Sequence, residues 1–218
     1  MHDPDERVRR NLEENRRTWS ENSYYDEAEA VMDEQWRRWV WPWIGGCDFT
    51  SVLELAPGHG RNSARLAEHA RDLHLVDINA SCIDFCRARF ARHSGPCRFH
   101  YHVNDGLGVP MIANDSVTLV YSWDAMVHFE PAVVRAYVRE FARVLVRGGR
   151  GAVHFSNFGA RAPDPNTTWG ENPHGRSQMT RTLFAQYLAE SGLVLVQDFV
   201  FDWEGHADID CAALFAKP

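Results

Sequence analysis

The strongest constraint on this chain is an alternation of short apolar segments with amphipathic segments of helical period, which begins at residue 51. We expect strands at residues 51–56, 72–77, 98–103, 116–123 and 150–156, and helices at residues 61–70, 80–93, 131–146 and 177–192. Such an alternation predicts a mostly parallel sheet with helices on both faces.

The end of the chain breaks this alternation. Residues 193–203 and 211–217 are apolar segments with no helical pattern between them. Two successive strands without a crossover form an antiparallel pair. We therefore predict an α/β fold with a doubly wound, seven-stranded, mostly parallel, Rossmann-like sheet and an antiparallel terminal hairpin at one edge.

A tryptophan-rich arm precedes the sheet. Residues 5–44 have helical period, and five of the eight tryptophans lie between residues 19 and 43. One helical face carries Ala28, Met32, Trp36, Trp39, Val40 and Trp43. Such an arm must pack against a large surface, either one edge of the main domain or a bound ligand. We predict an N-terminal helical arm or lid over residues 1–46 and a main domain over residues 47–218.

Charge and cysteine usage exclude several classes of protein. The net charge of -7 and the pI near 5.9 remove the usual electrostatic attraction to nucleic acid. No apolar run approaches the ~20 residues that span a bilayer, and the first ten residues are too charged for a secretory signal. The five cysteines include no CxxC pair, so we expect no disulfide framework, no metal and a cytoplasmic protein.

The first strand-to-helix turn carries the chemistry, because ligands of such sheets bind at the carboxyl ends of the strands. Gly58 and Gly60 allow a sharp turn and a close approach of the backbone to a ligand. Nineteen residues after Gly58, the second strand ends in Asp77, which could accept hydrogen bonds from both hydroxyls of a ribose. This pattern predicts a nucleoside ligand, although Asp77 could instead cap the following helix.

The residues around the turn bear on which nucleoside binds. A carboxylate at Glu54 would repel a pyrophosphate and attract an ammonium group. The turn continues with Arg61, Asn62 and Ser63, where a dinucleotide site wants a small residue for helix packing. These features argue against an NAD-dependent oxidoreductase, which stays open as an alternative.

Five segments together resemble class I S-adenosylmethionine-dependent methyltransferases of the small-molecule type. The segment VLELAPGHGRNS is similar to the first motif of that family, and LVDIN to its second strand with the ribose-binding acid. VNDG resembles the adenine loop, VTLVYSWDAMVHF the fourth strand with its substrate-facing loop, and FARVLVRGGRGAVHF the glycine turn before the fifth strand. The resemblance covers residues 50–217.

The resemblance implies a cofactor, S-adenosyl-L-methionine, and residues that bind it. Its methionine part would lie on Ala56, Gly58 and Gly60, with Glu54 near the amino group. Asp77 would bind the ribose and Ile78 would cover one face of the adenine. The remaining implied contacts are Asn104, Asp105 and Gly106 at the adenine amino group, and Ser122 and Trp123 beside the departing methyl group. Asp105 could equally be an ordinary turn residue, and His59 between the glycines is expected to face solvent.

The loop after the fourth strand offers a candidate general base. Asp124 and His128 are four residues apart, so one helical turn would stack a carboxylate beside an imidazole. The alternative is that Asp124 caps the turn and His128 packs beneath the next helix. In that case the base is sought at His154 or His174.

The expected function is methyl transfer to an oxygen or nitrogen of a small-molecule acceptor, without a nucleic-acid or membrane partner. The acceptor pocket and lid would come from the arm, through Trp19, Tyr24 and Tyr25, and from residues 158–176. Besides the oxidoreductase, a non-catalytic cofactor-binding module that docks a partner through the arm remains an alternative.

Overall fold

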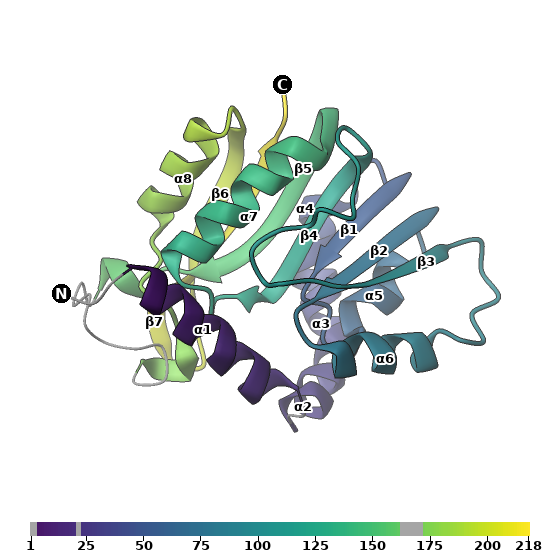
Figure 1. Cartoon of the computed structure of the whole chain (residues 1–218), viewed down its shortest axis with the longest axis horizontal. Helices are drawn as coiled ribbons and strands as arrows, with labels where there is room; N and C mark the ends of the chain where they lie inside the picture. Colours follow the sequence, from purple (N-terminus) through teal and green to yellow (C-terminus); the bar gives the residue numbers. More distant parts are fainter. Residues whose placement is uncertain (1–3, 21–22, 162–171) are drawn as a thin grey trace.

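Seven strands form one mixed sheet in the order β3-β2-β1-β4-β5-β7-β6 (Figure 1). The computed structural model describes residues 4–20, 23–161 and 172–218. The strands are β1 (Ser51–Leu55), β2 (Asp72–Asp77), β3 (Arg98–Val103), β4 (Val117–Met126), β5 (Leu145–Ser156), β6 (Val194–Trp203) and β7 (His206–Ala216). Strands β1 to β5 pair in parallel, and β7 is antiparallel to both β5 and β6. The predicted fold is confirmed.

Helices cover both faces of this sheet. They are α1 (Pro4–Trp19), α2 (Tyr24–Ala30), α3 (Met32–Gln35), the π-helix η1 (Trp36–Val40), α4 (Trp41–Ile44), α5 (Arg61–Leu66), α6 (Ala80–Arg89), α7 (Pro131–Val144) and α8 (Arg181–Glu190), with the 3-10 turns η2 (Phe158–Ala160) and η4 (Pro173–Gly175). Figure 1 shows α7 and α8 together on one face, where α1 also contacts α7.

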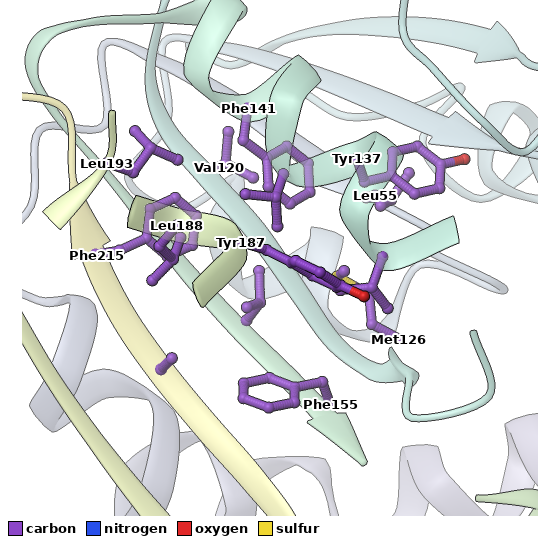
Figure 2. Packing of buried hydrophobic residues seen from close by; sticks show 14 of the residues in the cluster. Leu55, Val120, Met126, Tyr137, Phe141, Phe155, Tyr187, Leu188, Leu193 and Phe215 are labelled. Atoms are coloured by element: carbon purple, nitrogen blue, oxygen red, sulfur yellow. The ribbon is translucent and has the colours of Figure 1, made fainter. Parts of the chain in front are cut away.

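The side-chain period of the strands divides the core into two layers. In β4, Val120 packs beneath α7 and α8, while its neighbours Leu119 and Tyr121 face the other layer. Figure 2 shows the first layer, in which Phe141 of α7 and Leu188 of α8 lie over the sheet. The second layer receives the apolar face of the arm and of α5 and α6.

The arm differs from the continuous helix predicted over residues 5–44. It is divided between α1 and α2, and η1 separates α3 from α4. Pro42 does not end the helix, because it lies in the first turn of α4, where its missing N–H is not needed. Met32 and Ile44 are buried in the second core layer, and Leu12 packs on the first. The arm is thus built into the core, while the boundary at residue 46 stays a prediction.

Two predicted helix ends were also wrong. The last helix begins after Thr180 rather than at Ser177, because the Thr180 hydroxyl accepts a hydrogen bond from the N–H of Leu183 at 3.0 Å. Gly148 and Gly149, expected to end a helix, lie within β5. Much of the lid predicted at residues 158–176 falls on residues 162–171, outside the described residues. Over the described ranges, no helix is long and apolar enough to cross a membrane.

Candidate functional site

The turn between β1 and α5 has the backbone that its glycines predicted. Gly58 and Gly60 have φ angles of 55° and 80°, in the left-handed region that favours glycine. A Cβ atom on Gly58 would overlap Cε1 of Tyr25, and one on Gly60 would lie 3.1 Å from Sγ of Cys86. The turn therefore packs so closely that a side chain at either position would have to displace its neighbours.

Asp77, at the end of β2, braces this turn. Its carboxylate accepts hydrogen bonds from the N–H of Asn79 at 2.8 Å and from the N–H of Gly58 at 3.3 Å. The side chain is buried, and burial raises the pKa of Asp77 to about 6. Asp77 is not the cap of α6, because the N-cap residue is Asn79. The interaction with Gly58 joins Asp77 to the glycine turn.

A cavity with an empty volume of about 920 Å³ opens between the glycine turn, the end of β2, the arm and the end of β4. Eleven of the predicted site residues line it. Those from the turn and the adjacent loops are Ala56, Gly58, Asp77, Ile78 and Gly106, and those from the arm and the end of β4 are Trp19, Tyr24, Tyr25, Trp123, Asp124 and His128.

Other predicted residues lie behind the cavity wall. Glu54 is buried and accepts a hydrogen bond from the Ser63 hydroxyl at 2.5 Å, and burial raises the pKa of this carboxyl to about 7. The Ser122 hydroxyl donates to the Leu55 carbonyl at 3.0 Å and ties β4 to β1. Gly60 lies at the start of α5 and does not line the cavity.

Asn104 and Asp105 shape the loop that follows β3. The Asp105 carboxylate accepts hydrogen bonds from the N–H groups of Leu107 and Gly108, at 2.8 and 3.1 Å. These are the contacts expected if Asp105 is an ordinary turn residue. The Asn104 amide donates to the Gly108 carbonyl and to the hydroxyl of Tyr137, both at 2.8 Å. Neither side chain lines the cavity, although Gly106, the residue after Asp105, does.

The predicted stacking of Asp124 on His128 was wrong. Asp124 belongs to the extended end of β4, with a φ of 57°, so no helical turn joins the two residues. Its carboxylate instead accepts hydrogen bonds from the Tyr24 hydroxyl at 2.6 Å and from the Arg61 guanidinium at 2.7 Å. The strand itself was predicted, but β4 continues three residues past the apolar segment, and this extension could not be foreseen.

His128 still lines the cavity. Its Nδ1 lies 2.8 Å from the Gly175 carbonyl, which can only accept a hydrogen bond, so Nδ1 carries the proton and Nε2 the lone pair. Burial and the nearby charge of Arg176 lower the pKa of His128 to about 4. The ring is therefore neutral at neutral pH.

His154 and His174 lie outside the cavity wall. His154 is fully buried; its Nδ1 accepts from the N–H of Asp124 at 3.1 Å, and its Nε2 lies 3.0 Å from the Asp210 carboxylate. Asp210 in turn receives two hydrogen bonds from Arg176, at 2.8 and 2.6 Å. His174 lies on η4, where its Nδ1 is 3.3 Å from Glu204.

The comparison with protein families identifies the domain. A family model described as a methyltransferase domain matches residues 52–149. The chain carries a methyltransferase domain. The methyltransferase predicted from the sequence is confirmed for this domain, and with it the enzyme class.

Solved structures share the fold of this methyltransferase domain and its arm. Geranyl diphosphate C-methyltransferase from Streptomyces coelicolor A3(2), solved with Mg²⁺, geranyl diphosphate and S-adenosyl-L-homocysteine, has a TM-score of 0.71 at 14% identity, covering 95% of this chain and 98% of that chain. The PH0226 protein from Pyrococcus horikoshii OT3 has a TM-score of 0.63 at 16% identity, covering 92% and 93%. The cyclase SpnF has a TM-score of 0.65 at 13% identity, covering 88% and 81%. The comparison with curated proteins gives no match.

Sequence reasoning missed two features of the methyltransferase domain. Arg61 lines the cavity and binds Asp124, but the sequence offered only its place after the glycine turn as a signal. His59 does not simply face solvent: its ring stacks between Tyr25 and Phe85, with ring centroids 3.9 and 3.8 Å away. The arm supplies Tyr25, so a turn from the domain and a helix from the arm form one wall of the cavity.

Proposed function

We propose that this enzyme transfers a methyl group from S-adenosylmethionine to an oxygen or nitrogen atom of a small-molecule acceptor. The observation that carries the proposal is a single cavity that joins the glycine turn and Asp77 to polar and aromatic side chains of the arm and of the end of β4. S-adenosylmethionine, when bound, supplies a methyl group on a positively charged sulfonium, which is a good leaving group.

The residues around the turn suit this cofactor. Gly58 presents bare backbone to the cavity, and the buried Asp77 carboxylate holds only backbone N–H groups, which leaves lone pairs for ribose hydroxyls. Ile78 and Gly106 line the cavity beside each other, since a Cβ on Gly106 would lie 2.5 Å from Cδ1 of Ile78. We assign them to the adenine and Ala56 to the methionine part.

Residues behind the wall support these contacts. Glu54 places a buried carboxyl group beneath the turn, where its charge would favour the amino group of the methionine. Asn104 and Asp105 hold the loop that presents Gly106, and Ser122 fixes β4 beneath Trp123. Gly60 lets the chain enter α5. We assign these residues to positioning the cofactor rather than to contact with it.

The acceptor is held by the other half of the cavity. Holding an acceptor atom in line with the methyl group can contribute roughly 7–11 kcal/mol to a displacement of this kind. A hydroxyl acceptor also has to lose its proton. His128 is placed to accept it, because its ring is neutral and its Nε2 carries the lone pair.

Calorimetry with S-adenosylhomocysteine and with NAD tests the cofactor assignment. We expect S-adenosylhomocysteine to bind and NAD to bind at least tenfold more weakly. Tight NAD binding without S-adenosylhomocysteine binding would support an NAD-dependent oxidoreductase instead of a methyltransferase. Cofactor binding without turnover on any small hydroxyl or amine compound would instead support a non-catalytic module.

A further inference from the structure

The acceptor half of the cavity forms a connected group of side chains, which we call the acceptor end and define as Trp19, Tyr24, Trp123, Asp124 and His128. The indole of Trp19 lies 6.0 Å from the ring of Tyr24 and 4.8 Å from the ring of His128, as measured between centroids. The Tyr24 hydroxyl donates to Asp124 at 2.6 Å. The Trp19 ring therefore contacts the rings of both Tyr24 and His128, and Tyr24 also binds the Asp124 carboxylate.

Arg61 is the one arginine or lysine among the described residues that line the cavity. Its guanidinium is already bound: it donates to Asp124 at 2.7 Å, to the Gln35 side chain at 3.2 Å and to the Ala28 carbonyl at 3.3 Å. The side chains of Arg61 and Asp124 are only 10% and 2% exposed. The cation is thus neutralised inside the wall rather than presented to a ligand.

The imidazoles of the cavity add no positive charge. Burial lowers the pKa of His59, and burial with the charge of Arg176 lowers that of His128 to about 4. An anionic group on a ligand would therefore find no unpaired cation, and losing its hydration without a countercharge is unfavourable. Of the remaining acidic groups of the lining, Glu29 is paired with Arg89, and the buried Asp77 carboxylate would repel the anion.

Two donors at the acceptor end lack partners within the described part of the chain. The indole N–H groups of Trp19 and Trp123 are buried, and neither makes a hydrogen bond. Buried N–H groups usually have an acceptor. An uncharged oxygen or nitrogen atom of a ligand would satisfy them once the arm adjusts around it.

We propose that the buried Arg61–Asp124 pair makes Asp124 a specificity-determining residue, so that the acceptor end takes uncharged, ring-containing molecules and rejects carboxylated or phosphorylated ones. This inference rests on the proposed function in calling the bound molecule a methyl acceptor. The predicted preference for uncharged ligands does not depend on that function. Removing the Asp124 charge would leave Arg61 as an unpaired cation in the wall, able to bind an anion.

A matched pair of probes tests the proposal: indole, and indole-3-carboxylate, which carries the same ring with one added anion. Their dissociation constants are measured by calorimetry, with and without S-adenosylhomocysteine. The wild-type protein should bind indole at least tenfold more tightly than indole-3-carboxylate. Asp124→Asn should reverse or abolish this ratio, and it keeps the backbone, because asparagine tolerates a φ of 57°.

Two further variants make the result specific. The double variant Arg61→Gln with Asp124→Asn should restore the preference for indole. Asp33→Asn, which removes a partner of the exposed Arg65, should leave the wild-type ratio unchanged. Thermal unfolding and circular dichroism establish that each variant is folded before its ratio is read.

Every outcome bears on the proposal. Equal binding of both probes to the wild-type protein, or a folded Asp124→Asn variant with an unchanged ratio, would overturn it. Failure of indole to bind at all would overturn the ring-binding part. Failure of S-adenosylhomocysteine to bind would count against the proposed function alone, since the ratio of the two probes is also measured without it.

Discussion

Asp77 is the residue whose protonation should control cofactor affinity most directly. Burial raises its pKa to about 6, and only the ionised form offers all of its lone pairs to the ribose hydroxyls. We therefore expect the dissociation constant of S-adenosylhomocysteine to increase as the pH falls from 7.5 to 5. Calorimetry across this range measures the effect, and Asp77→Asn should remove most of the dependence that Asp77 causes.

Replacing Asp77 separates its binding role from its role in the fold. Asp77→Ala should weaken cofactor binding by at least tenfold, or ~1.4 kcal/mol, while the protein stays folded. The raised folded pKa also means that Asp77 contributes stability below its unfolded pKa, near 4, and that this contribution is lost as the pH rises through about 6. Asp77→Asn should then be no less stable than the wild type at pH 7. An unchanged dissociation constant in Asp77→Ala would remove the ribose assignment.

His128 should titrate far from neutrality. A histidine base with an ordinary pKa would make turnover rise with pH near neutrality, but burial and Arg176 lower the pKa of His128 to about 4. We now expect kcat to be level from pH 6 to 8 and to fall as the pH approaches 4. Because an imidazole with a pKa of about 4 is a weaker base than one that titrates near neutrality, His128→Ala should lower kcat for a hydroxyl acceptor toward the lower end of the ~10²–10⁴-fold range, with cofactor affinity preserved. A loss of cofactor binding instead would identify His128 as structural.

The same shift has a consequence for stability. Because the folded pKa of His128 is depressed, its contribution is present above the unfolded pKa, near 6.5, and is lost as the pH falls through about 4. The free energy of unfolding of the wild type should therefore decline over this window more than that of a folded His128→Gln variant. Urea titrations at pH 7 and pH 5 compare the two.

At the scale of elements, the C-terminal end of α1 lies at the cavity, so a tryptophan there can detect ligand binding. Asn11 of α1 donates to the His128 carbonyl at 2.9 Å and accepts from the Glu130 N–H at 3.1 Å, and Trp19 at its end lines the cavity. We expect tryptophan fluorescence to change on addition of S-adenosylhomocysteine. Trp19→Phe should reduce the change by more than half, whereas Trp41→Phe, which lies away from the cavity lining, should not. Equal changes in both variants would place the response elsewhere.

A second connection joins β5, β7 and η4 behind β4. Burial would raise the pKa of Asp210, but His154 and Arg176 lower it to about 2, so the carboxylate is ionised between these two side chains. Removing one partner of a buried ion pair costs ~3–5 kcal/mol, so Asp210→Ala should lose about that much free energy of unfolding. Asp198→Ala, which removes a partner of the exposed Arg181, should lose less than ~1 kcal/mol. Urea denaturation distinguishes these values.

At the scale of the whole molecule, the sheet was predictable because its signals are local. Each parallel strand is a short apolar segment, and the glycine turn and Asp77 follow directly from where two such strands end. The antiparallel pair of β6 and β7 was readable for the same reason, since no helical pattern separates them. Periodicity and turn chemistry suffice for such features.

The parts that failed depend on contacts between distant segments. The end of β4 continues past the apolar segment because Met126 pairs with Phe155, and this removes the helical turn expected between Asp124 and His128. Arg61 meets Asp124 across 63 residues, and Tyr24 meets it across 100. No local pattern records such pairings. The contacts of Asp124 with Arg61 and Tyr24, on which the proposed specificity depends, could therefore not be predicted from the sequence.

The contact between Tyr25 and Gly58 has a further meaning when the protein is considered as a population of conformers. The Tyr25 ring and the cofactor position that we propose on Gly58 exclude each other, so under this assignment the cofactor binds only those molecules in which Tyr25 has moved away. If about one molecule in ten is open at a given moment, the apparent dissociation constant is about tenfold weaker than the intrinsic one. The association rate would then level off at high cofactor concentration, at the opening rate of the arm.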